Sequence, residues 1–122
     1  HGLSYTQFSY GTIKLSSDKL SKDSSITATV NVTNSGDMAG KEVVQMYIQD
    51  VAGSVSRPVR ELKGFRKILL NPGESKTVEF KITPDMLAFW NQRMEFGAEN
   101  GAFEVFIGGD STTSNKAGFI LE

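Results

Sequence analysis

The sequence predicts an all-β protein, folded as an antiparallel β-sandwich of about seven strands. Short runs of β-branched and aromatic residues alternate with turn-forming clusters at fairly even spacing, as in sandwiches and barrels. Several runs alternate apolar and polar residues with a period of two, which places their apolar side chains on one face. The 122 residues, 39% of them hydrophobic and 22% charged, suffice for one globular domain with its own core.

The first half of the chain contains two clear strand patterns. Residues 25–33 alternate strictly, with Ile26, Ala28, Val30 and Val32 on one face. Residues 41–50 place Val44, Met46 and Ile48 inward, and their other face is also partly apolar, so we expect this strand to be central. The following stretch, residues 50–60, contains glycine, serines and proline and is predicted to be a loop or a crossing between sheets.

The third strand, residues 62–70, changes its hydrophobic phase. Leu62, Ile68 and Leu70 are in phase, whereas Phe65 is not. Gly64 lies between the two phases, and a glycine inside a strand often marks a β-bulge, which would let Phe65 change face.

The second half of the chain continues the pattern of strands and turns. Residues 71–74 read Asn-Pro-Gly-Glu and fit a type II turn. Strands are predicted at 78–82, 103–107 and 119–121, and Thr83-Pro84-Asp85 predicts one short helical turn near 84–91. The order and size of these elements are compatible with an immunoglobulin-like sandwich.

Strand alternation predicts one shared core between the two sheets. We expect it to contain Val30, Val32, Val44, Met46, Ile48, Val78, Phe80, Ile82, Phe103, Val105 and Ile107.

Composition argues against several classes of function. A net charge of −1 provides no broad basic surface for nucleic acid. No apolar run approaches the roughly 20 residues that cross a bilayer, so we expect no membrane partner. Cysteine is absent, and the one histidine is the terminal His1, so we expect no metal, no cofactor and no thiol or histidine catalysis.

Two kinds of side chain could still belong to a functional site. Glu61, Glu95 and Glu99 lie nearest to irregular segments and could form a glycosidase carboxylate pair, although solvated surface or pairing with a nearby arginine is the more ordinary interpretation. Among the aromatics, Phe89, Trp90, Tyr47 and Phe106 could stack on sugar rings, but core packing is the usual role of such residues. Trp90 follows Leu87 by three residues, as in a short helix packed on the sandwich.

Several sequence runs resemble the C-terminal domain of family 3 glycoside hydrolases. The runs are Gly2-Leu3-Ser4-Tyr5-Thr6-Gln7-Phe8, Val43-Val44-Gln45-Met46-Tyr47-Ile48, Arg57-Pro58-Val59-Arg60-Glu61-Leu62-Lys63-Gly64-Phe65-Arg66-Lys67, Leu70-Asn71-Pro72-Gly73-Glu74 and Gly101-Ala102-Phe103-Glu104-Val105-Phe106-Ile107-Gly108. The resemblance covers essentially the whole chain, and residues 46–50 and 89–92 are most similar to periplasmic β-glucosidases of Gram-negative bacteria.

The resemblance implies a fibronectin type III-like domain without catalytic residues. The parent enzyme would remove terminal β-D-glucosyl residues with retention, using a nucleophile and an acid/base from preceding domains, in the periplasm or outside the cell. No catalytic motif of that family matches a position here, and no signal peptide is present in this sequence. The partners implied are the catalytic domains of the same chain.

The domain organisation follows from the apolar start of the chain. We predict an entry segment or linker at residues 1–11 and the sandwich at 12–122. Leu3, Tyr5 and Phe8 are more apolar than a flexible linker requires, so they are candidates for an interdomain interface, with Arg57 and Arg60 at its polar rim. Alternatively, Phe8 and Tyr10 fold back as a first strand.

Two other functions stay open at this point. A carbohydrate-binding module would present exposed aromatics and amides and contact a β-glucoside or oligosaccharide. An independent enzyme would need a cleft with paired carboxylates.

Overall fold

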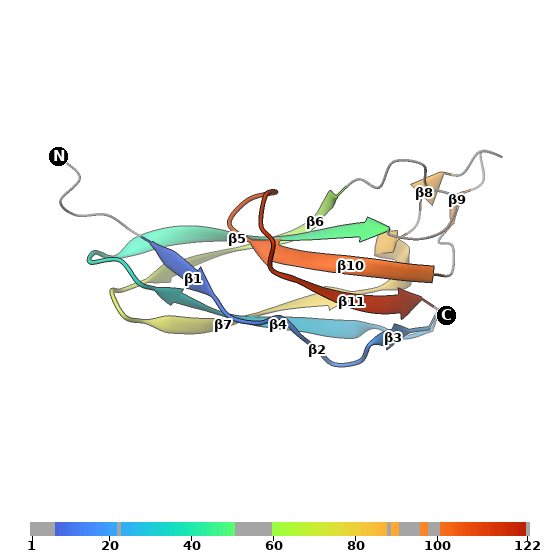
Figure 1. Cartoon of the computed structure of the whole chain (residues 1–122), viewed down its shortest axis with the longest axis horizontal. Coiled ribbons are helices and arrows are strands. Elements are labelled where there is room, and N and C mark those ends of the chain that lie inside the picture. The colour runs from blue at the N-terminus through green and yellow to red at the C-terminus, as the bar shows by residue number, and fades with distance from the viewer. Residues whose placement is uncertain are drawn as a thin grey trace.

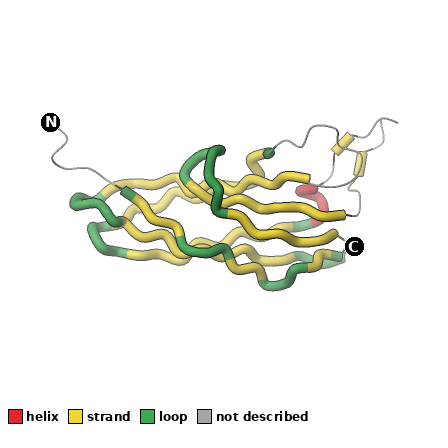
Figure 2. Tube along the Cα trace, viewed as in Figure 1, coloured by secondary structure: helices red, strands yellow, loops and turns green. Residues whose placement is uncertain are grey.

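The chain folds into two β-sheets packed face to face, as a computed structural model shows (Figures 1 and 2). The structure describes residues 7–21, 23–50, 60–87, 89–90, 96–97 and 101–121; at 50, 89–90 and 96–97 it describes only the backbone. The elements are β1 (Phe8–Tyr10), β2 (Lys14–Leu15), β3 (Lys19–Leu20), β4 (Ile26–Asn34), β5 (Gly40–Asp50), β6 (Glu61–Leu70), β7 (Ser75–Ile82), the 3-10 helix η1 (Pro84–Leu87), β8 (Phe89–Trp90), β9 (Phe96–Gly97), β10 (Gly101–Gly108) and β11 (Lys116–Leu121). The predicted all-β sandwich is confirmed.

The first sheet, called sheet A, is built around β4. The whole of β4 pairs antiparallel with β7, from Ile26↔Ile82 to Thr33↔Ser75. Along its other side, β1 and β2 follow one another, and both pair antiparallel with β4. β1 and β2 thus resemble one strand with an interruption between them. Within that interruption the amide of Gly11 still donates to the carbonyl of Asn31.

The second sheet, called sheet B, has the order β3-β11-β10-β5-β6. Its pairs are antiparallel except β3 with β11, which is parallel. The N-terminal segment therefore crosses from sheet A to sheet B after β2. This division of the N-terminal segment is why the two sheets contain nine strands, four and five, where the sequence predicts about seven.

The core lies between the two sheets and contains every residue predicted from alternation, each at most 5% exposed. Phe103 and Phe119, paired neighbours on β10 and β11, stack with ring centroids 5.7 Å apart. Alternation did not identify Ile13 and Leu20, whose strands are too short to show a period, yet both are buried in the same cluster.

The predicted bulge lies in β6. Pairing with β5 shifts register between Met46 and Tyr47, so that Met46 faces Gly64 and Tyr47 faces Leu62. Leu62 and Phe65, three residues apart, consequently lie on the same outer face, with 52% and 53% exposure. The prediction that Leu62 shares a face with Ile68 and Leu70 is therefore wrong, because the extra residue at the bulge reverses the alternation of side chains.

Asn34 lies between two turns at one end of the sandwich, the turn that follows β4 and the turn at residues 71–74 that follows β6. It is the one buried polar residue among those described. Its side-chain amide donates to the carbonyls of Met38, at 2.9 Å, and Leu70, at 3.0 Å. In the second turn, Gly73 has φ 79° and the amide of Glu74 donates to the carbonyl of Asn71 at 2.9 Å, as the predicted type II turn requires.

The helical turn is shorter than predicted. It ends at Leu87, which is buried, and Phe89–Trp90 pairs with Phe96–Gly97 as a strand. The aromatic residues that sequence reasoning placed on the helix have high β-propensity, and pairing with a second strand has overridden the helical signal. Within the described residues, no helix has the length and apolarity to cross a membrane.

Candidate interdomain surface

The predicted interface residues lie in three different situations. Leu3, Tyr5 and Arg57 fall outside the described residues. Phe8 opens β1 opposite Asn34, is half-buried and packs against the core cluster. The alternative in which Phe8 and Tyr10 form a first strand is thus what the structure contains, while the division at residues 11 and 12 stays a prediction.

Arg60 stands at the start of β6 and contacts the turn between β10 and β11. Its Nη1 donates to the carbonyls of Ser111 and Thr113, both at 2.7 Å. The guanidinium carbon lies 3.7 Å from the ring centroid of Phe106, which is only 3% exposed although its strand neighbours face the core. A cation stacked on an aromatic face, with two hydrogen bonds, fixes this corner of the outer face of sheet B.

The same outer face is apolar and uncovered further along, on β5 and β6. Val43, Leu62, Phe65 and Leu69 are 38%, 52%, 53% and 56% exposed, and we call these four residues the β5–β6 patch. Large apolar side chains gathered on one face of a domain commonly mark an interaction surface.

A second cluster joins the edge of sheet A to sheet B. The hydroxyl of Tyr10 on β1 donates to Glu42 Oε2 on β5 at 2.7 Å. Burial, together with that hydrogen bond and the negative charge of Glu42, raises the pKa of Tyr10 well above its ordinary value of 10.0. This contact is structural, since it holds a phenol in its neutral form.

Of the three candidate carboxylates, Glu61 alone lies within the described residues. The side chain of Glu61 is 60% exposed, and its Oε2 lies 3.4 Å from Lys63 Nζ. Glu61 is therefore a solvated surface residue, the more ordinary of the two interpretations. Glu95 and Glu99 lie outside the described residues. In the part of the chain that is described, no three His, Asp or Glu side chains gather as metal ligands.

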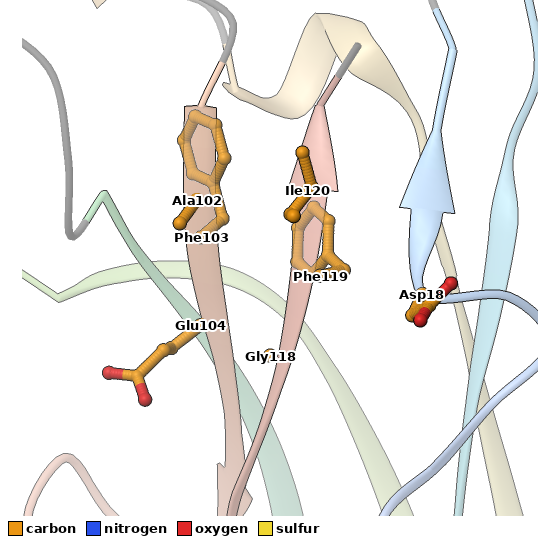
Figure 3. Close-up of a pocket in the computed structure, with 7 residues that line it drawn as sticks. All are labelled: Asp18, Ala102, Phe103, Glu104, Gly118, Phe119 and Ile120. Atoms are coloured by element: carbon orange, nitrogen blue, oxygen red, sulfur yellow. The ribbon is translucent and has the colours of Figure 1, made fainter.

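One hollow of about 330 Å³ lies along β10 and β11 (Figure 3). Its acidic groups are Asp18 and Glu104, which stand on opposite sides with Gly118 between them (Figure 3). Glu104 is moreover paired with Lys116 at 3.1 Å. In Figure 3 the side chain of Glu104 points away from Asp18.

The aromatics divide into covered and uncovered ones. Phe103 and Phe119 face the core, and Phe106 is covered by Arg60. The side chains of Phe89 and Trp90 fall outside the described part, so their predicted packing is not tested. Among the described aromatic side chains, Phe65 alone is strongly exposed, which does not make a row for stacking a sugar chain.

Comparison with known proteins places this sandwich in a family. The Fn3-like family, described as fibronectin type III-like domain, matches residues 42–111, and the chain belongs to it.

The relatives of the full chain are longer glycosidases. It is 52% identical over 121 residues to a periplasmic β-glucosidase of Salmonella typhimurium, covering 99% of this chain and 16% of that protein. A β-xylosidase of Formosa agariphila is 46% identical over 110 residues, 90% of this chain and 15% of the relative. The structure of a Listeria innocua β-glucosidase in complex with glucose superimposes with a TM-score of 0.86 at 40% identity, over 99% of this chain and 17% of that one.

These comparisons confirm the resemblance drawn from the sequence. The chain is the fibronectin type III-like domain that forms a small C-terminal part of family 3 β-glucosidase chains. It spans about one sixth of the length of the relatives it matches.

Sequence reasoning missed the β5–β6 patch. It noted that Val43 and Tyr47 make the second face of β5 partly apolar, but it placed Leu62 in phase with the core. The signal was available in Gly64, since a bulge at that position puts Leu62 and Phe65 on one face.

Proposed function

We propose that this chain is a non-catalytic accessory domain of a β-glucosidase, and that it stabilises the parent enzyme by docking on its catalytic domains. The observation that supports this most directly is coverage: essentially the whole chain aligns with about one sixth of each relative, which leaves the greater part of those enzymes for the chemistry. The position of Glu61, an exposed side chain beside Lys63, is in keeping with it, because this candidate acid is a surface residue.

The parent chain would hydrolyse terminal non-reducing β-D-glucosyl residues with retention, and it would work in the periplasm or outside the cell. The name of the Salmonella relative supports both the substrate and the location. The Formosa relative is named a β-xylosidase, so β-xylosides belong among the substrates to be tested.

The proposed contact with the catalytic domains includes Leu3 and Tyr5 of the entry segment and the region of Arg57 and Arg60, whereas Phe8 packs against the domain's own core. Apolar side chains at the entry would be covered by the neighbouring domain. Arg60 is already bonded to the β10–β11 turn, and in this proposal it braces that turn rather than forming the rim itself.

The test compares the 122-residue chain with its parent enzyme on aryl β-glucosides and β-xylosides. The parent should turn over at least one substrate, and the folded chain, checked by circular dichroism, should match buffer alone. The Glu61→Gln, Glu95→Gln and Glu99→Gln variants serve as controls. Turnover that co-purifies with the chain and is lost in one of these variants would refute the non-catalytic assignment.

A further inference from the structure

The β5–β6 patch is continuous across two strands. Residues paired across an antiparallel ladder share a face, and Val44, Met46 and Ile48 face the core, so their neighbours on β5 face outward. The outward pairs are Lys41↔Leu69, Val43↔Lys67, Gln45↔Phe65 and Tyr47↔Leu62. Val43 is therefore diagonal to both Phe65 and Leu69, within the reach of side-chain contact.

Two polar side chains of this surface, Tyr47 and Gln45, are already hydrogen-bonded within the domain. The hydroxyl of Tyr47 donates to Gln45 Oε1, and Gln45 Nε2 donates to the carbonyl of Gly109 at 3.0 Å. Covering the patch would consequently bury apolar surface without leaving these groups unsatisfied, which is the main cost of burying polar atoms.

Two aromatic residues on the outer face of sheet B differ in exposure, because Phe106 is covered and Phe65 is not. Tyr47 has Phe106 on β10 as one neighbour and Leu62 on β6 as the other. Phe106 is covered by the guanidinium of Arg60, whereas Phe65 keeps 53% of its surface exposed. Covering Phe65 therefore requires something beyond the part of the chain that the structure describes.

On the part of this face formed by β5 and β6, the charges have one sign. On the outward positions of β5 and β6, which are described throughout, the charged residues are Lys41 and Lys67. Lys67 lies opposite Val43, and Lys41 lies opposite Leu69. An apolar surface framed by lysine is complementary to a surface with an apolar centre and acidic residues at its rim.

The start of β1 lies near the Leu69 end of the patch. Phe8 pairs with Asn34, and the side chain of Asn34 donates to the carbonyl of Leu70, the residue after Leu69. Phe8, at the start of β1, is thus linked through Asn34 to the residue next to Leu69. A short tether gives the linked partner an effective concentration of about millimolar, so a modest surface suffices for docking.

We propose that the β5–β6 patch docks on the larger, N-terminal remainder of the parent β-glucosidase, on an apolar surface rimmed by aspartate and glutamate. This inference rests on the proposed function as a C-terminal accessory domain, and it adds a docking surface to the predicted entry segment. The coverage of the relatives provides the occupant, since more than four fifths of each lies outside this domain.

The experiment is done in the intact parent enzyme. Phe65→Ser and Leu69→Ser should each shorten the half-life of heat inactivation about fivefold or more, because the docked surface loses its apolar contacts. Lys67→Glu should do the same, and its effect should weaken in high salt. The matched control is Ile120→Ser, which alters a side chain 48% exposed on β11 of the same sheet and should change the half-life less than about twofold.

A second measurement does not depend on stability. Hydroxyl-radical footprinting of the unaltered parent should show Phe65 and Leu69 protected relative to Ile120. Oxidation of Phe65 as fast as in the separate chain would overturn the inference, and so would protection that vanishes on dilution, since that would indicate a second copy of the enzyme.

Deletion of the whole domain separates the two possible failures. If the parent is as stable without the domain as with it, the proposed accessory function is refuted. If deletion destabilises the parent but the Phe65 and Leu69 variants behave as Ile120→Ser does, the function stands and the β5–β6 patch is refuted.

Discussion

Single polar residues hold together parts of this sandwich that are distant in sequence. Asn34, which is fully buried, joins the turn after β4 to the end of β6. Arg60 joins the start of β6 to the turn after β10. Tyr10 joins β1 of sheet A to β5 of sheet B through Glu42. In each case a side chain supplies a bond between segments that no backbone ladder connects.

Tyr10 predicts a dependence of stability on pH. Its pKa in the folded chain is raised, first by burial and then by Glu42, whereas the unfolded chain ionises near 10.0. Above pH 10 the unfolded state therefore binds fewer protons than the folded state, so the stabilisation present below pH 10 is lost as pH rises. The expected slope is below about 1 kcal/mol per pH unit, since the half-buried ring is partly screened.

The measurement compares urea unfolding of the natural chain and of Tyr10→Phe between pH 8 and pH 11. The difference in unfolding free energy between them should shrink as pH rises, because the variant has no phenol at this position to ionise. Parallel curves over this range would show that Tyr10 is not responsible.

At the scale of the element, two irregular positions determine how sheet B presents its faces. The bulge at Gly64 turns Leu62 outward beside Phe65, and a Cβ at Gly64 would lie 3.2 Å from Phe80 Cδ1 in the core. On the other side of β5, at nearly the same level, Gly108 ends β10 directly against Thr113 of the following turn. Both glycines are positions of close approach, at which any side chain displaces a neighbour.

The turn between β10 and β11 should not tolerate a methyl group at Gly108. A Cβ there would lie 2.9 Å from Thr113 Cγ2 and closer still to its Cβ, and Thr113 is also the residue whose carbonyl binds Arg60. Gly108→Ala should lower the free energy of unfolding by about 1–3 kcal/mol, as overpacking does. Gly118→Ala on β11 is the control, because its Cβ would only touch the carbonyl of Phe103 at 3.8 Å.

Urea unfolding of both variants gives this comparison directly. Gly118→Ala should remain within about 0.5 kcal/mol of the natural chain. Equal losses in the two variants would show that contact with Thr113 is not the cause.

At the scale of the whole molecule, the domain is one part of a larger enzyme. The core between sheets A and B is complete in itself, whereas the β5–β6 patch remains open on the outer face of sheet B. A closed core with one open apolar face is typical of a domain that folds as a unit and docks as a unit.

The entry segment predicts a difference between the domain and its parent. If Leu3 and Tyr5 contact the catalytic domains, replacing both with serine should move the melting temperature of the 122-residue chain by less than about 2 °C, as expected for exposed positions. The intact parent should lose thermal stability. Phe8→Ser is the contrasting variant and should destabilise both, because Phe8 packs against the core. Equal loss in chain and parent from the Leu3 and Tyr5 changes would place these two residues in the core instead.

The long strands and the core could be predicted from the sequence because their evidence is local. Val30, Met46, Phe80 and Val105 alternate with polar neighbours, and a period of two assigns each side chain to a face. The turn at Gly73 could likewise be predicted from the local Pro72-Gly73 pair. The resemblance to family 3 glycoside hydrolases also came from the sequence, and the comparisons confirmed it.

Tertiary structure decided the features that depend on partners remote in sequence. The N-terminal segment is divided among β1, β2 and β3 because it pairs with β4 in one sheet and with β11 in the other. Phe106 is buried on the outer face with Arg60 stacked on its ring, and Leu62 faces outward because of the bulge opposite β5. Alternation along one strand reports which residues share a face, but what covers that face depends on the arrangement of other strands, and this is why only the fold revealed the β5–β6 patch.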